Sequence, residues 1–192
     1  MKKMLPFLPA LLLLLLSCKS KEKTKDESFF PVLSFIKGQV NHVDTSLYQI
    51  MKLNIIDSSR VDTEYVRRED FRELAKDFLE IPDLADPTYS KRFQEERILD
   101  NNLGRILMIY LPTDREKETV QRQEVLVTPD EGIGKMNSVI INYYSNTKDS
   151  SVEKKMLWRV DQSFQVTTIT QKPGMPESIT TTKVVWNESA EQ

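Results

Sequence analysis

The stretch Met136–Gln171 reads MNSVIINYYSNTKDSSVEKKMLWRVDQSFQVTTITQ. It contains three runs rich in β-branched and aromatic residues, which are Met136–Tyr144, Val152–Val160 and Phe164–Gln171. Turn-forming residues separate these runs, first at Asn146–Asp149 and then at Asp161–Gln162. Because connections this short join antiparallel neighbours, the stretch predicts three strands of an antiparallel meander.

The same spacing extends in both directions from this stretch. Four further runs have the same character, and they are Arg92–Leu99, Arg105–Leu111, Thr119–Val127 and Ser178–Trp186. Turn residues such as Asn101-Asn102 and Pro173-Gly174 separate them. Seven strands are therefore predicted from residue 92 onward. Leu47–Ile56 is predicted as an additional, earlier strand, which ends at the turn residues Asp57-Ser58-Ser59.

The strands differ in how their apolar residues alternate. In Val152–Val160, Met156 and Trp158 share one face, while charged residues occupy the other, so one buried and one wet face are expected. Arg105–Leu111 has apolar residues at both odd and even positions, which predicts a strand covered on both sides.

Two segments before residue 91 have a helical period. Phe29–Val43 carries apolar residues at i, i+4, i+7 and i+11, and Pro31 suits a first turn. Arg68–Glu80 has one apolar stripe, made of Phe71, Leu74, Ala75, Phe78 and Leu79, on an otherwise charged helix. Pro82 ends this helix, and Asp83–Tyr89 is predicted as a loop.

These elements predict an α+β fold. Two N-terminal helices are expected to pack on a strongly curved antiparallel sheet of about seven to eight strands, because a long meander curls. The expected shape is a half-barrel, and a closed small β-barrel is the alternative.

The N-terminus has a composition of its own. Residues 1–18 read MKKMLPFLPALLLLLLSC, in which two lysines precede an apolar run that ends in Leu15-Leu16-Ser17-Cys18. A basic segment followed by a short apolar one is the secretory pattern. The run from Met4 to Leu16 is shorter than the ~20 apolar residues that a spanning helix needs.

The four residues Leu15-Leu16-Ser17-Cys18 resemble the lipobox of bacterial lipoproteins. In that family the cysteine thiol receives a diacylglycerol, and a signal peptidase cuts the chain just before it. The resemblance implies lipid attachment at Cys18 and cleavage after Ser17. An uncleaved signal anchor, or an ordinary secretory peptide with an incidental cysteine, are the alternatives.

This resemblance implies three parts: a signal peptide at 1–17, a polar tether at 18–28, and a single domain at 29–192. The tether sequence after Cys18, KSKEKTKDES, has no apolar residue and cannot bury surface. It begins without an acidic block, and Lys19 stands where some lipoproteins carry the aspartate that retains them in the inner membrane. In that family this favours the outer membrane, with the domain facing the periplasm.

Composition excludes some classes of function. Loss of residues 1–17 removes Lys2 and Lys3, which lowers the Lys+Arg count from 27 to 25 against 29 Asp+Glu, a formal net charge of −4. A mildly acidic chain without a basic stripe gives no reason to expect nucleic acid as a partner. Cys18 is the only cysteine, so no disulfide can form within the chain.

Residues capable of catalysis or metal binding are present but form no recognisable motif. His42 is the only histidine and has no ligand-like neighbour in sequence. Asp57 with Asp62, or Glu95 with Glu96, could be proposed as acid–base pairs, but the latter two point to opposite sides of a strand. Gly132-Ile133-Gly134 lies between two strands and is read as a hairpin loop. We therefore predict no catalytic residue, no metal and no cofactor.

The expected function is thus a membrane-anchored binding or interaction module of the cell envelope that is not an enzyme. The membrane, reached through the lipid, and envelope proteins are its expected partners. The alternative is a periplasmic carrier or chaperone for a hydrophobic ligand, such as a lipid or lipoprotein. In that case Trp158 and Phe164 are the candidate ligand-binding residues, although core packing against the two helices is the favoured explanation, because the apolar stripe of the second helix needs partners.

Overall fold

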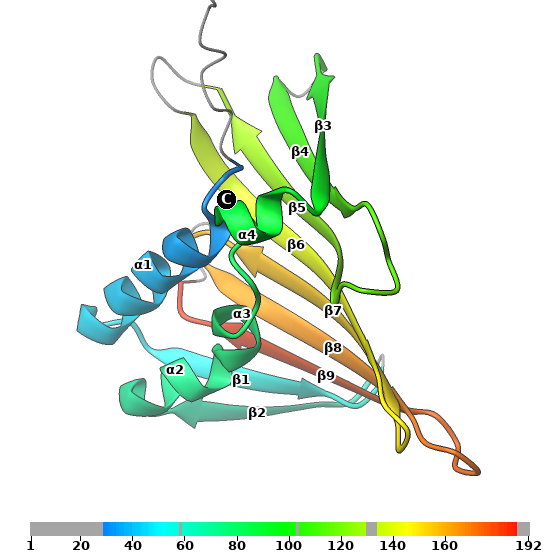
Figure 1. The fold of residues 1–192 in the computed structure, drawn as a ribbon. Coiled ribbons are helices and arrows are strands. Elements are labelled where there is room, and N and C mark those ends of the chain that lie inside the picture. The colour runs from blue at the N-terminus through cyan, green and yellow to red at the C-terminus, as the bar shows by residue number, and fades with distance from the viewer. Residues whose placement is uncertain (1–28, 58, 103, 130–133, 188–192) are drawn as a thin grey trace, which may run out of the picture.

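The computed structural model describes residues 29–57, 59–102, 104–129 and 134–187 (Figure 1). Nine strands in these ranges form one antiparallel sheet in the order β2-β1-β9-β8-β7-β6-β5-β4-β3. The strands are β1 (Ile50–Ile55), β2 (Val61–Val66), β3 (Phe93–Asp100), β4 (Arg105–Pro112), β5 (Val120–Thr128), β6 (Lys135–Asn146), β7 (Ser151–Arg159), β8 (Ser163–Gln171) and β9 (Ser178–Val185).

The predicted meander is confirmed from β3 to β9, because each of these strands pairs with the next one along the chain. The β1–β2 hairpin then joins at the β9 side, where Leu53 pairs with Lys183. β2 and β3 are the two ends of this order and do not pair with each other. The sheet is therefore open, and the alternative of a closed small barrel is wrong.

The strand count was too low because β2 was missed. Its sequence VDTEYV is exposed at every position except Val66, which is only half-buried. An edge strand without a buried face lacks the alternation of apolar and polar residues by which strands are recognised.

The tight turn predicted at Asp161–Gln162 is confirmed between β7 and β8. Asp161 adopts a positive φ of 58°, a conformation that aspartate tolerates better than most residues. Its backbone N–H also donates to Oε1 of Gln39, at 2.9 Å, which ties this turn to the first helix.

That first helix, α1 (Val32–Thr45), begins three residues later than predicted and ends two residues later. Pro31 precedes it and does not lie within its first turn. The side chains of Val32, Ile36, Val40 and Val43 form its buried stripe. Phe29 lies outside the helix, and its ring packs against that of Tyr110 at 4.7 Å between centroids.

The helix predicted over Arg68–Glu80 is divided into three short pieces. They are the 3-10 turn η1 (Arg68–Asp70), α2 (Phe71–Leu74) and α3 (Lys76–Leu79). The break falls at Ala75, whose carbonyl accepts a tight i+3 hydrogen bond from the Phe78 N–H, at 3.0 Å. The predicted stripe is nevertheless the buried face, since Phe71, Ala75 and Phe78 are buried.

A single helical turn, α4 (Pro87–Ser90), lies in the segment predicted as a loop. Pro87 occupies its start, and the carboxylate of Asp86 accepts from the Thr88 N–H at 2.7 Å. This local capping explains why a helical turn forms here, although the segment is too short to show a helical period in its sequence.

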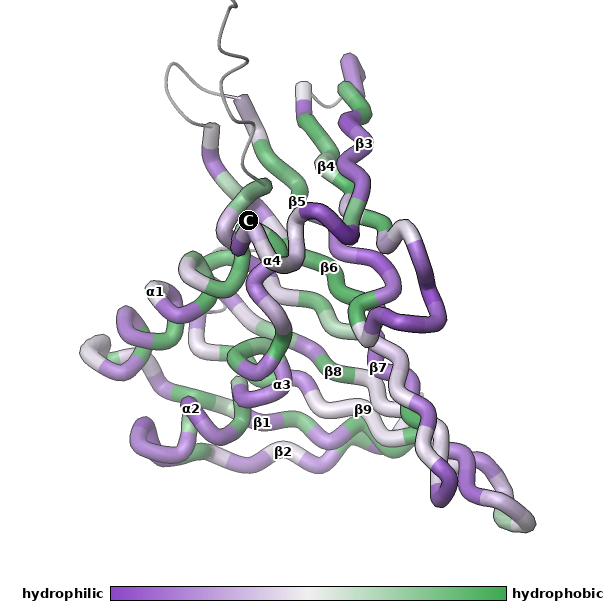
Figure 2. Tube along the Cα trace, viewed as in Figure 1, coloured by the Kyte–Doolittle hydropathy of each residue, from purple (hydrophilic) through white to green (hydrophobic). Residues whose placement is uncertain are grey.

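The labelled helices lie together on one side of the sheet (Figure 1). The sheet residues that face them include Ile141, Met156 and Val184, and all three are fully buried or nearly so. Hydrophobic residues recur along β4, β5 and β6 in Figure 2. In β4 the neighbours Ile109 and Tyr110 are both buried although they face opposite sides, but residues 105–108 and Leu111 are only half-buried, so the predicted double coverage holds at this point and not along the whole strand.

Candidate functional site

Trp158 and Phe164, the candidate ligand-binding residues, belong to an aromatic cluster beneath α2 and α3. The two rings are stacked, with centroids 5.3 Å apart and an interplanar angle of 17°. Phe71 and Phe78 reach down from the helices and Trp186 follows β9, each within 5.9 Å of a ring in this cluster. Neither candidate lines the two surface depressions described below.

The other candidates are spread over the molecule. Cys18 and the tether at 18–28 lie outside the described residues, as does most of Gly132–Gly134. His42 is exposed at the end of α1, with its ring 5.9 Å from that of Tyr48. Glu96 is exposed on β3, whereas Glu95 on the opposite face is half-buried and paired with Arg97 at 2.7 Å.

Asp57 lies in the β1–β2 turn, where it accepts hydrogen bonds from the side chain and backbone of Ser59. These bonds lower the pKa of the Asp57 carboxyl. In the part of the chain that the structure describes, no three His, Cys, Asp or Glu residues gather as a metal site would need. None of the helices described there is long and apolar enough to cross a membrane.

Two polar residues are buried side by side on the helix-facing side of the sheet. Tyr110 on β4 pairs across the ladder with Gln123 on β5, and their exposed fractions are 0% and 1%. The Tyr110 hydroxyl accepts from the Phe30 N–H at 3.1 Å. The Gln123 amide makes no hydrogen bond through either of its side-chain atoms within the described ranges. Such a buried unpaired amide lowers stability.

Burial raises the pKa of Tyr110 to about 12. In the unfolded chain a tyrosine titrates near 10. Between about pH 10 and pH 12 the Tyr110 hydroxyl therefore keeps its proton in the folded chain and loses it in the unfolded chain. The contribution of Tyr110 to the free energy of unfolding is fully present below pH 10 and falls as the pH rises through this window. We expect absorbance at 295 nm to reveal one late-titrating tyrosine, and Tyr110→Phe to remove it and flatten the loss of stability. An unchanged titration curve in Tyr110→Phe would contradict this assignment.

The larger of the two described depressions lies where the end of α1 meets η1 and α2. Its volume is about 370 Å³, and it is lined by Asp44, Arg68, Glu69 and Arg72. Asp44 accepts from Arg72 at 2.7 Å, and Asn41 accepts from the same guanidinium nitrogen at 2.9 Å. These bonds hold α1 against α2 and fix one wall of the depression.

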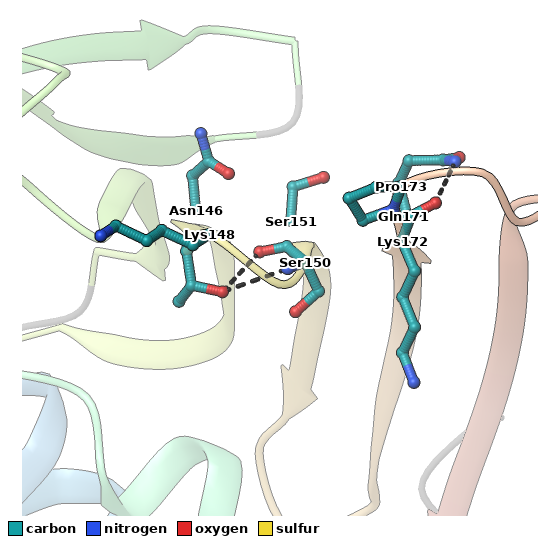
Figure 3. A pocket seen from close by; sticks show the side chains of 8 residues that line it. Asn146, Lys148, Ser150, Ser151, Gln171, Lys172 and Pro173 are labelled. Atoms are coloured by element: carbon teal, nitrogen blue, oxygen red, sulfur yellow. Dashed lines mark hydrogen bonds between the residues drawn. The ribbon is translucent and has the colours of Figure 1, made fainter.

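The second depression lies between the β6–β7 turn and the end of β8 (Figure 3). Its volume is about 200 Å³, and polar side chains dominate its lining. Several of these side chains already form hydrogen bonds with nearby residues. Thr147 bonds to Ser150, and Gln171 donates to the carbonyls of Lys172 and Met175. Figure 3 shows Lys148 and Lys172 pointing in different directions, so the two cations do not converge on one group.

The residues around the larger depression were not singled out from the sequence. Arg68 and Arg72 stand one turn apart, a spacing that equally describes an ordinary solvated helix face. Asp44 lies 24 positions before Arg68, and only the packing of α1 on η1 and α2 brings them together.

The chain matches no protein family, no curated protein and no solved structure in comparisons of sequence and fold.

Proposed function

We propose that this chain is a lipoprotein of the bacterial cell envelope, attached by a lipid on Cys18, whose domain is a binding module without catalysis. The observation that carries the proposal is the sequence Leu15-Leu16-Ser17-Cys18 at the end of a basic and then apolar leader. The proposed site is the outer membrane, with the domain facing the periplasm.

The start of the fold supports a tethered arrangement. Phe29 and Phe30 follow the polar segment directly, and they already pack on the sheet through Tyr110. A cleaved chain would thus have about ten polar residues between its lipid and its first packed residue. The half-barrel shape, with the sheet curving around the helices, is part of this proposal.

The carrier alternative has less support. A carrier of this type needs an apolar cavity between the sheet and the helices that cross it. The aromatic cluster occupies the space beneath α2 and α3, and both described depressions are lined mainly by polar residues.

Lipid attachment is tested by expressing the chain in a bacterium and measuring the mass of the product. The expected product lacks residues 1–17, carries a lipid at Cys18 and fractionates with the outer membrane. In Cys18→Ser, lipid and processing should both be lost. A matched control combines Cys18→Ser with Ser20→Cys, which restores one thiol two residues away and should restore neither. If Cys18→Ser is processed and fractionates like the natural chain, the anchor proposal is wrong.

The module and the carrier predict different results with the same preparations. Cross-linking in intact cells should recover a specific envelope protein if the domain is an interaction module. Native mass spectrometry of the purified chain should show an additional retained lipid if it is a carrier. The absence of a specific cross-linked protein would overturn the interaction module.

A further inference from the structure

We propose that the depression between α1 and η1–α2 binds a carboxylate group, with Arg68 as its main contact. This inference rests on the proposed function only in treating the domain as a binding module, and it names the chemistry of one binding site. The ligand is a single carboxylate, from either a small organic acid or an acidic peptide segment.

The ion pairs around the site identify the arginine that has no partner among the described residues. Arg72 is paired with Asp44 at 2.7 Å, and Glu69 lies 3.5 Å from Arg67. Arg67 is also bound by Asp70, through two hydrogen bonds of 3.0 and 3.2 Å. Within the described part of the chain, the Arg68 side chain makes no hydrogen bond or ion pair. Three arginines and three carboxylates balance here, but Glu69 and Asp70 both pair with Arg67, so Arg68 is the arginine without an ion-pair partner in the described ranges.

Part of the Arg68 side chain is also buried. Arg68 is only half-exposed, and its Nε atom is buried without an acceptor, so part of the guanidinium group is already removed from water. The cost of desolvating this part is thus met before any ligand arrives. A planar guanidinium suits a carboxylate, which it can bind through two parallel hydrogen bonds.

The same lining disfavours more highly charged anions. Asp44 and Glu69 both face the depression, so a phosphate dianion would meet two carboxylates there. A carboxylate carries a single charge and can pair with Arg68 alone. Arg72 has guanidinium nitrogens beyond the one that Asn41 and Asp44 use, and these can bind the second oxygen of the ligand.

The test uses the full chain purified in detergent micelles and follows the Nε–Hε resonance of Arg68 by NMR. The resonance is assigned by its absence in Arg68→Lys. The probes are acetate, a blocked tetraglutamate peptide, inorganic phosphate and chloride, all compared at constant ionic strength. We expect saturable shifts with acetate or the peptide, and none with phosphate or chloride.

Three variants complete the test. Arg68→Gln should weaken binding at least about tenfold, and Arg68→Lys should weaken it because an ammonium lacks the planar fork. Binding by these two variants is measured through the backbone amides of residues 68–72. Arg60→Gln makes the same change of charge on the β1–β2 turn, outside the depression, and should bind normally. The proposal is overturned if Arg68→Gln binds as well as the natural chain, or if phosphate or chloride produces the same shifts.

The two probes that support the proposal also separate the sources of the carboxylate. Equal affinity for acetate and the peptide indicates a small acid, whereas tighter binding of the peptide indicates an acidic segment. Failure of this titration leaves the Cys18 experiment unaffected, and failure of lipid attachment leaves the titration unaffected, so the two proposals are tested separately.

Discussion

Trp158→Ala is expected to lower the free energy of unfolding by about 3–5 kcal/mol, the range for removing a large aromatic side chain from a packed core. Trp158 is fully buried and touches three other rings of the cluster. The cavity left by the indole opens between β7 and α3, so the contact that holds the helices to the sheet is weakened. Since domains are stable by about 5–15 kcal/mol, this single change removes a large part of the total.

Urea denaturation followed by circular dichroism measures this effect. The control is Trp158→Phe, which keeps a ring against Phe78 and Phe164 and should cost only about 1–2 kcal/mol. The Trp158 Nε1 makes no hydrogen bond within the described ranges, so the change to phenylalanine loses volume but no polar contact. If Trp158→Ala unfolds at the same urea concentration as the natural chain, Trp158 is not a core residue, and its role as a ligand contact gains support.

The sheet from β3 to β9 was predictable because its information is local. Alternation within each run and turn residues between runs fix both the strands and their neighbours, as in the β7–β8 hairpin around Asp161. The position of β1 was not predictable in this way. It pairs with β9, more than 100 residues later, and no local pattern specifies a partner that distant.

The helical segments show a second limit. The stripe of Phe71, Ala75 and Phe78 correctly predicted which face is buried, yet the backbone breaks at Ala75. Periodicity reports which side chains face the core, whereas the tightening of a turn depends on the tertiary contacts that those side chains make.

The candidate carboxylate site shows the third limit. Its selection depends on which charges are already paired, and Arg67, Arg68 and Arg72 are equivalent in the sequence. Only the pairing of Arg67 with Asp70 and of Arg72 with Asp44 distinguishes Arg68 as the arginine without an ion-pair partner in the part of the chain that the structure describes. The Arg67–Asp70 pair spans three residues and spacing could suggest it, whereas the Arg72–Asp44 pair joins two helices and cannot be derived from spacing.

Arg92→Ala is expected to lower the free energy of unfolding by about 2–4 kcal/mol, because it leaves a buried carboxylate without its counterion. The guanidinium of Arg92 donates to Glu118 at 2.7 Å, and the exposed fractions of the two side chains are 42% and 7%. This pair joins the start of β3 to the loop before β5. Arg92 also lies over the ring of Tyr89, 4.5 Å from its centroid, so α4 is attached to the same contact.

The unequal burial of the two partners predicts an asymmetry. Glu118→Gln keeps an oxygen that can accept from Arg92, whose side chain is 42% exposed although its Nε is buried, and should cost only about 1 kcal/mol. Arg92→Ala instead isolates the carboxylate of Glu118, which water reaches poorly. The double variant should recover part of the stability that Arg92→Ala loses, because an unpaired neutral amide costs less to bury than an unpaired carboxylate.

Denaturation of the two single variants and the double variant gives the coupling between the residues directly. The matched control lies in the same loop, where Lys117 and Asp114 form an exposed ion pair at 2.7 Å, and Lys117→Ala should change stability little. If Glu118→Gln proves as costly as Arg92→Ala, the asymmetric burial does not decide the energetics. The pair would then act mainly through the attraction of its two charges, which either substitution removes.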